Sequence, residues 1–254
     1  MVVRLRYYFV ILLLIISPLS WAIDINVSFG LSPDSSEFDI LQPKKNKLLK
    51  VADSVINAID EHYSAGSINI KYYPFARSVD NVLKGRSDVH FPMLQIRGVS
   101  ADKLPFAFVS QSLSRAVFVL YTALDKPILD MENLEKYNLS TQRGHKHLFP
   151  FIVSENNNIR QGFEKLLRGR TDGYIVAQGL GDRYIIKHKL SNIRRTFYLY
   201  GEAGFIIRKD DDQQLLDDII SNALLELKRS GRLAQLTKTL SSEYVDWKPA
   251  EMGW

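Results

Sequence analysis

The chain has 254 residues, of which 46% are hydrophobic and 24% charged, enough for one large domain or two lobes with a sizeable core. Its net charge of +5 is spread along the sequence without a basic run or an arginine-rich tail, which argues against a nucleic-acid partner. It contains no cysteine, so neither a disulfide framework nor a thiol nucleophile is available.

The first 22 residues differ from the rest of the chain. A basic start, MVVRLR, precedes the apolar run YYFVILLLII, and small residues Ser20 and Ala22 flank Trp21. This pattern predicts a secretory signal peptide over 1–22, cleaved after Ala22. A membrane anchor is the alternative, but the apolar run is about half of the roughly 20 residues that a spanning helix needs. Without a cysteine at the cleavage site the product is not a lipoprotein, and export without disulfides predicts a periplasmic protein.

Strands and helices alternate from Ile23 onward. Alternating or β-branched runs predict strands over 23–30, 67–74 and 88–94. An apolar stripe with helical spacing predicts a helix over 43–63, and a shorter helix is expected over 75–85. Strands separated by helices at this spacing indicate parallel βαβ units and an α/β fold.

The second part of the chain continues the alternation. We expect strands over 115–122, 138–142 and 172–178, and two more within 193–209. We expect helices over 131–137, after Gly144, and over 158–169, 210–231 and 232–240. The helix over 210–231 is the clearest, because Asp210–Asp212 begin it, Lys228 and Arg229 lie near its end and Gly231 stops it.

One motif occurs twice. LKGRSDVHF (83–91) and LRGRTDGYI (167–175) both read as the end of a helix, a glycine stop, an aspartate and a strand. This predicts the same helix-to-strand connector in two places. Asp88 and Asp172 are therefore expected to hold the turn and not to perform chemistry.

Five stretches together carry a family resemblance, and they follow one another in the order YYPFARSVDNVLKGRSDVHFPM, FVLYT, ILDMENLEKYNLSTQRGH, FEKLLRGRTDGYIVAQ and GFIIRKDDDQQLLDDIISNALLELKRSGRLAQLTKTL. The chain resembles the bacterial extracellular solute-binding proteins of family 3, the periplasmic receptors of ABC-type amino-acid uptake systems. The resemblance implies a type II periplasmic-binding-protein-like fold, with two α/β lobes and a ligand cleft that closes by hinge motion. It places lobe 1 at 23–118 plus 202–254 and lobe 2 at 122–198.

Residues at the carboxyl ends of the strands are the candidates for the cleft, because ligands bind there in open α/β sheets. The rule selects Gly30, Leu31, Tyr73, Phe75, Met93 to Arg97, Gln142 to His145, Ala177 and Gln178. From these and the neighbouring Arg77, the predicted ligand-binding set is Tyr73, Phe75, Arg77, Met93, Gln95, Arg97, Arg143, Gly144 and Gln178.

These residues suggest specific contacts. Tyr73 and Phe75 would form an aromatic wall, although one of them could instead pack into lobe 1. Arg97 would pair with a carboxylate, or lie solvated in a loop. Arg143 and Gly144 precede an expected helix, whose free N–H groups would attract an anion.

Two departures from the family pattern shape the expected ligand. The resemblance implies a Thr-x-x-Arg motif for the ligand carboxylate, but Arg97 lies in MLQIRGVSADKLPFAF with a different spacing. It also implies an aspartate five residues after the connector aspartate, for the ligand ammonium, where this chain has Ala177. We therefore expect a small polar ligand that is not a standard α-amino acid.

Other functions have weaker support. No G-x-S-x-G motif is present, the glycines at 179–181 do not complete a dinucleotide fingerprint, and His145 and His147 would not share a helix face. No catalytic residue, metal or cofactor is therefore predicted. The expected partners are a small polar molecule and an ABC permease or a membrane sensor, with a monomeric protein. A sensory module, or a scaffold that has lost its ligand, remains an alternative.

Overall fold

The structure is a computed structural model that describes residues 23–31, 47–95, 100–238 and 244. Its strands are β1 (Ile25–Leu31), β2 (Ile68–Pro74), β3 (Val89–Gln95), β4 (Ala107–Phe108), β5 (Ser114–Ala123), β6 (Leu139–Gln142), β7 (Val153–Asn156), β8 (Gly173–Ala177) and β9 (Ile193–Ile207). Its α-helices are α2 (Lys47–Asp60), α3 (Phe75–Leu83), α4 (Ile159–Leu167), α5 (Gln178–His188), α6 (Gln213–Arg229) and α7 (Arg232–Thr237). Short 3₁₀ turns occur at η2 (Ala101–Lys103), η3 (Leu134–Lys136) and η4 (Lys146–Leu148). Within the described part of the chain the fold is therefore α/β, as predicted.

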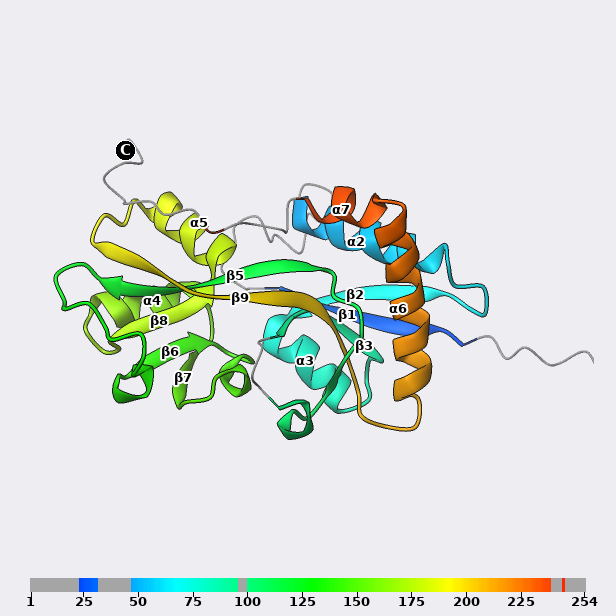
Figure 1. The fold of residues 1–254 in the computed structure, drawn as a ribbon, viewed down its shortest axis with the longest axis horizontal. Helices are drawn as coiled ribbons and strands as arrows, with labels where there is room; N and C mark the ends of the chain where they lie inside the picture. The colour runs from blue at the N-terminus through cyan, green and yellow to red at the C-terminus, as the bar shows by residue number, and fades with distance from the viewer. Residues whose placement is uncertain (1–22, 32–46, 96–99, 239–243, 245–254) are drawn as a thin grey trace, which may run out of the picture.

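The strands form one continuous sheet in the order β2-β1-β3-β9-β5-β8-β6-β7, with β4 beside β9 (Figure 1). β1, β2 and β3 run parallel at one end, and β6, β7 and β8 run parallel at the other. The antiparallel pair β5 and β9 joins the two groups and belongs to both. The molecule therefore has two α/β lobes that share their central strands.

The long strand β9 differs from the sequence prediction. Two strands were expected over 193–209, but one strand of 15 residues runs through the region. Gly201 does not break it, because the missing side chain lets β9 pass close to Leu94 and to the carbonyl of Gln95, where a Cβ would lie at 2.6 Å and 3.0 Å. A register shift in the β5–β9 ladder between Phe118 and Val119 accommodates the twist between the two lobes.

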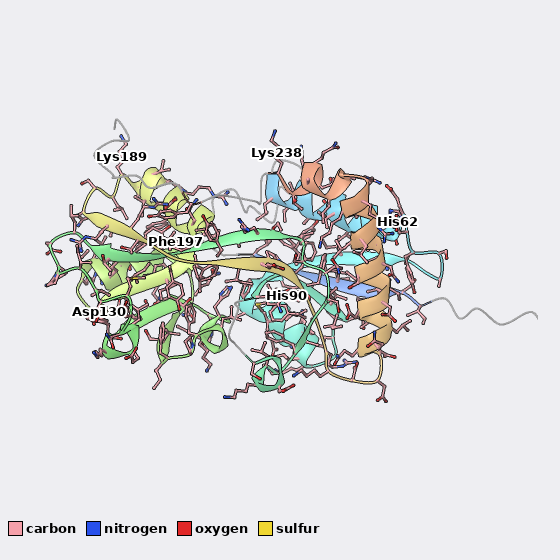
Figure 2. All side chains as sticks on the ribbon, in the orientation of Figure 1. His62, His90, Asp130, Lys189, Phe197 and Lys238 are labelled. Atoms are coloured by element: carbon pink, nitrogen blue, oxygen red, sulfur yellow. The ribbon has the colours of Figure 1, made fainter. Side chains whose placement is uncertain are left out.

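Three hydrophobic clusters hold the fold together. One packs α2, α6 and α7 against β1 and β3. A second packs α4 and α5 against β5 and β8. The third, which includes Phe75, Met93, Phe118, Leu139 and Ile175, draws its side chains from both lobes. Figure 2 shows His90 and Phe197 on opposite sides of this junction.

Two strands and one α-helix were not predicted, namely β4, β7 and α5. The strand β7 is short, and helix α5 begins QGLG, with two glycines that lower helix propensity. Gly181 has a packing reason, because a Cβ there would lie 2.4 Å from the ring of Tyr121. Conversely, the helices expected over 131–137 and after Gly144 are only the three-residue turns η3 and η4.

The repeated connector is confirmed. The carboxylate of Asp88 accepts the backbone N–H of Asn26 at 2.7 Å, and that of Asp172 accepts the N–H of Asn138 at 2.8 Å. In return, the N–H of each aspartate donates to the carbonyl of the same asparagine, at 2.9 Å and 2.8 Å. Gly85 and Gly169 have φ angles of 66° and 64°, which glycine adopts most easily. Both aspartates therefore hold a turn, as expected.

Candidate functional site

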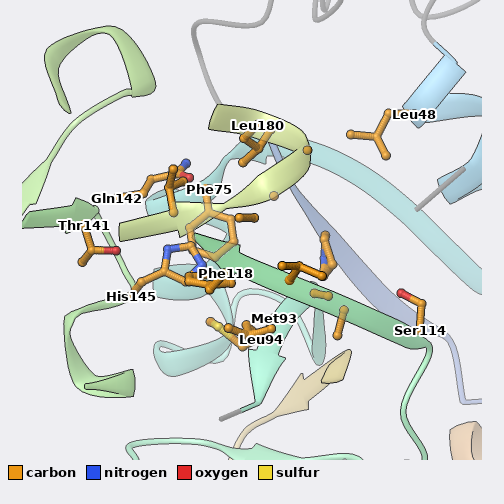
Figure 3. A pocket seen from close by; sticks show the side chains of 18 of the residues that line it. Leu48, Phe75, Met93, Leu94, Ser114, Phe118, Thr141, Gln142, His145 and Leu180 are labelled. Atoms are coloured by element: carbon orange, nitrogen blue, oxygen red, sulfur yellow. The ribbon is translucent and has the colours of Figure 1, made fainter. Parts of the chain in front are cut away.

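A cavity of about 220 Å³ lies where the two lobes meet (Figure 3). Two pairs of parallel strands, one pair in each lobe, bring residues from their carboxyl ends to it, namely Gly30 from β1 and Met93 from β3, and Gln142 from β6 and Ala177 from β8. The shared strand β5 supplies the floor through Ser114, Ala116 and Phe118, and α5 contributes Leu180 and Arg183. The cavity thus lies where the strand-end rule predicts a ligand site.

An aromatic stack joins the two lobes beside this cavity. The ring of Phe75, the first residue of α3, stacks on the imidazole of His145 with 4.5 Å between centroids and 16° between planes. Phe118 meets the same imidazole edge-on at 6.0 Å, and His90 meets Phe75 edge-on at 5.2 Å. Phe75 and His145 are only 7% and 8% exposed, so the contact excludes water.

Two glycines make room for Phe75. A Cβ on Gly30 would lie 2.8 Å from the Phe75 ring and 2.8 Å from His90. A Cβ on Gly144 would lie 3.0 Å from the same phenyl ring, and Gly144 also has a φ of 96°. The position of the aromatic stack therefore depends on a glycine in each lobe.

His90 lies under Phe75 and is fully buried. Its Nδ1 lies 2.6 Å from the hydroxyl of Ser78. Burial, together with the smaller effect of the nearby His145, lowers the pKa of His90 to about 3. The imidazole of His90 is therefore neutral at physiological pH, so it adds no charge to the base of the site.

Gln142 is the most distinctive polar group in the cavity wall. Its side chain is 3% exposed, and among the described residues its Oε1 has no hydrogen-bond partner. The neighbouring Thr141 is satisfied, because its hydroxyl donates to the carbonyl of Ile175 at 2.9 Å. Gln142 therefore brings an acceptor without a protein partner to the cavity wall.

The structure brings only part of the predicted site together. Phe75 and Met93 line the cavity, and Gly144 contacts Phe75 from the opposite lobe. Arg97 lies outside the described residues. Among the described cavity-lining residues, none is Tyr73, Arg77, Gln95, Arg143 or Gln178.

Some of these absent residues have other partners. Gln178 is buried, and its Oε1 accepts from the guanidinium of Arg195 at 3.3 Å. The guanidinium of Arg143 donates to Asn157 at 3.2 Å.

The helix expected after Gly144 is the short turn η4, and the N–H groups of Arg143, Gly144 and His145 are already bonded. The N–H of Arg143 donates to Asn156, that of His145 donates to Gln142, and that of Gly144 donates to the carboxylate of Glu155 at 2.7 Å. A carboxylate already occupies the place that an anion would take.

Several lining residues were not in the predicted set. Gln142 and His145 had been selected by the strand-end rule but left out of the final choice. Thr141 and Phe118 lie within strands, and Leu180 and Arg183 belong to the unpredicted helix α5. Recognising α5 from the sequence would have identified the last two.

Neither a metal centre nor a membrane span is found in the portion that the structure describes. There, histidine, aspartate and glutamate side chains do not gather in groups of three or more that could hold a metal ion. No described helix is long and apolar enough to cross a bilayer.

Comparison with solved structures gives the class of fold. A mutant of ArgBP from T. maritima superposes with a TM-score of 0.60 and 20% identity, over 85% of this chain and 94% of that one. A histidine kinase sensor domain with similarity to periplasmic binding proteins gives 0.63 and 14%, over 86% and 96%. An ancestral amino-acid-binding protein, a precursor of cyclohexadienyl dehydratase, gives 0.56 and 17%, over 85% and 94%.

The chain therefore has the type II periplasmic-binding-protein fold. No protein-family model matches its sequence, and no curated protein matches it either.

Proposed function

We propose that this chain is a periplasmic solute-binding protein, which captures a small ligand as its two lobes close. The observation that carries the proposal is the cavity between the lobes, to which β1, β3, β6 and β8 each bring the end of a strand. Each lobe supplies one ring of the Phe75–His145 stack, so opening the lobes separates the stack and exposes the cavity. Lobe 1 is 23–118 plus 202–254, lobe 2 is 122–198, and the exported protein is a monomer that begins at Ile23.

Binding, and not catalysis, is the function that the side chains near the cavity favour. His90 is neutral and hydrogen-bonded to Ser78. Asp182, beside Arg183 on α5, is paired with Arg195 at 2.7 Å and accepts from Tyr121 at 2.8 Å. These groups are committed to structure, so an acid–base pair aimed into the cavity is lacking among the described residues.

Delivery to an ABC-type permease is the role we infer for the bound form. The fold likeness to a histidine kinase sensor domain favours a second role, in which the closed form signals to a membrane partner. The two roles are separable: deletion of the gene abolishes ligand uptake in the first and leaves uptake intact but removes a transcriptional response in the second.

A thermal-shift screen tests ligand capture. The whole chain is expressed and recovered from the periplasm, and its intact mass reports whether cleavage follows Ala22. A panel of amino acids, polyamines, dicarboxylates, sugars, short peptides and small aromatic molecules is then added. A ligand at 100 times its Kd adds about 2.7 kcal/mol to the free energy of unfolding. Absence of any shift across the panel contradicts ligand capture.

A further inference from the structure

We propose that the ligand of this cavity is a small, flat, largely apolar and uncharged molecule that donates one hydrogen bond to Gln142. This inference rests on the proposed function and narrows it, because a polar ligand was expected from the sequence. Three independent features of the cavity carry it: its charge, the unpartnered Oε1 of Gln142 and its shape.

The charge of the cavity disfavours a cation. No aspartate or glutamate is among the described residues that line it. The acids on neighbouring segments are already used, because Glu155 accepts from Gly144 and Asp182 pairs with Arg195. An ammonium buried there would therefore lack a counter-charge, and burying an unpaired charge is costly.

The only arginine in the described lining does not create an anion site. The side chain of Arg183 is exposed, and its Nε donates to the carbonyl of Gly179 at 2.7 Å. An exposed guanidinium at the rim contributes little to binding a carboxylate. The other titratable side chain in the described lining is His145, whose ring packs against Phe75 and Phe118.

Gln142 supplies a directional requirement. A buried acceptor without a donor costs about 1–3 kcal/mol, which a ligand N–H or O–H would recover. The corresponding position in the other lobe is Gly30, which offers no side chain. The ligand is therefore anchored by one hydrogen bond from one lobe, and the rest of its surface meets apolar groups such as Met93, Leu94, Phe118 and Leu180.

The size and walls fit a ring system. A cavity of about 150 Å³ lined by apolar side chains binds benzene, and this cavity measures about 220 Å³. Phe75, Phe118 and His145 present ring faces and edges around it (Figure 3). A fused bicyclic molecule with one N–H group, such as indole, matches both the volume and the acceptor.

The test is isothermal titration of the protein recovered from the periplasm with indole, indene, tryptamine, indole-3-acetate, L-arginine and L-glutamate. Indole and indene share a shape, but only indole carries the N–H donor. We expect indole to bind roughly tenfold more tightly than indene, and the charged molecules to bind more weakly than indole.

Gln142→Leu provides the decisive variant. It keeps the volume but removes the acceptor, so indole affinity should fall to that of indene while indene affinity is unchanged. Because a buried unsatisfied acceptor is lost, the variant should fold with equal or higher Tm. Gln161→Leu, on α4 and outside the described lining, is the matched control and should leave both affinities unchanged.

The outcomes separate the two levels of the proposal. Tighter binding of an amino acid, tryptamine or indole-3-acetate than of indole overturns the neutral, apolar class but keeps ligand capture. Equal binding of indole and indene overturns the role of Gln142. If indole does not bind but another molecule of the thermal-shift panel does, only the inferred ligand class is overturned. If no molecule binds, the proposed ligand capture is overturned as well.

Discussion

The two lobes contain the same helix-to-strand connector, and their similarity extends to the strand that each connector aspartate contacts. Asn26-Val27-Ser28 in β1 corresponds to Asn138-Leu139-Ser140 at the start of β6, each bonded to its own connector aspartate. Ser28 donates to the carbonyl of Val89 at 3.3 Å, and Ser140 donates to that of Gly173 at 3.4 Å. Each carbonyl belongs to the residue after the connector aspartate. The backbone frame of both lobes therefore follows one pattern.

The difference between the lobes lies in the side chains that this frame presents. Beneath α3, Ser78 and His90 form a hydrogen-bonded pair. The matching positions under α4 are Gly162 and Tyr174, and the larger ring of Tyr174 fills the space that a Gly162 side chain would need. Between the first and the second lobe, the helix residue becomes smaller (Ser78 to Gly162) while the ring on the strand becomes larger (His90 to Tyr174).

The largest effect should come from transplanting one packing pair into the other lobe. A Cβ on Gly162 would lie 2.4 Å from the Tyr174 ring, so Gly162→Ser should lower the free energy of unfolding by about 1–3 kcal/mol. Adding Tyr174→His recreates the first lobe's pair and should recover about 1 kcal/mol. Urea unfolding of the single and double variants measures this coupling. If the effects of Gly162→Ser and Tyr174→His on the free energy of unfolding simply add, the Ser–His pair of the first lobe cannot replace the Gly–Tyr pair of the second.

The next largest effect is the pH dependence of the free energy of unfolding, to which His90 of the first lobe contributes. The pKa of buried His90 is lowered from 6.5 to about 3, mainly by burial, so only the unfolded chain takes up this proton between those values. The contribution is therefore complete above pH 6.5 and is lost as pH falls towards 3. Between pH 7 and pH 5 it amounts to about 2 kcal/mol of unfolding free energy. A Ser78→Gly/His90→Tyr double variant, which copies the second lobe, should lose less stability over this range. An identical pH dependence would contradict the assignment.

A smaller effect tests whether the joints are equivalent. Asp88→Ala and Asp172→Ala each remove a carboxylate that accepts a backbone N–H, and each should cost about 1 kcal/mol in denaturant unfolding. The two losses should agree within experimental error and add in the double variant, because the sites lie in different lobes. A loss confined to one variant would show that only that joint stabilises its lobe.

The smallest effect on stability, but the most specific on binding, is expected at Ala177. Ala177 and Met93 each lie five residues after a connector aspartate, and both line the cavity. Ala177 is half-buried, so Ala177→Asp should change stability by less than about 0.5 kcal/mol. The new carboxylate should raise tryptamine affinity and lower indole affinity in the titration. Unchanged preference would mean that residue 177 does not face the ligand.

The sequence predicted the elements whose signal is local. Both connectors were found because glycine at positive φ, the aspartate and the apolar strand lie within a few residues of one another. Phe75 and Met93 were found because parallel strands end at a common edge. Helix α5 was missed because its two glycines lower helix propensity, and Gly181 is required by packing on Tyr121, a contact distant in sequence. Gln142 was not in the predicted ligand-binding set, because its unmet hydrogen bond appears only in the folded structure.

The shared strands β5 and β9 also restrict how the two lobes can move. Backbone hydrogen bonds link this pair to each other and to the strands on either side, so sliding one lobe along the other would break a ladder. Bending or twisting the pair keeps the ladder intact. Motion between the lobes is therefore expected to be a rotation about this strand pair, by bending or twisting, and the width of the cleft follows from that rotation.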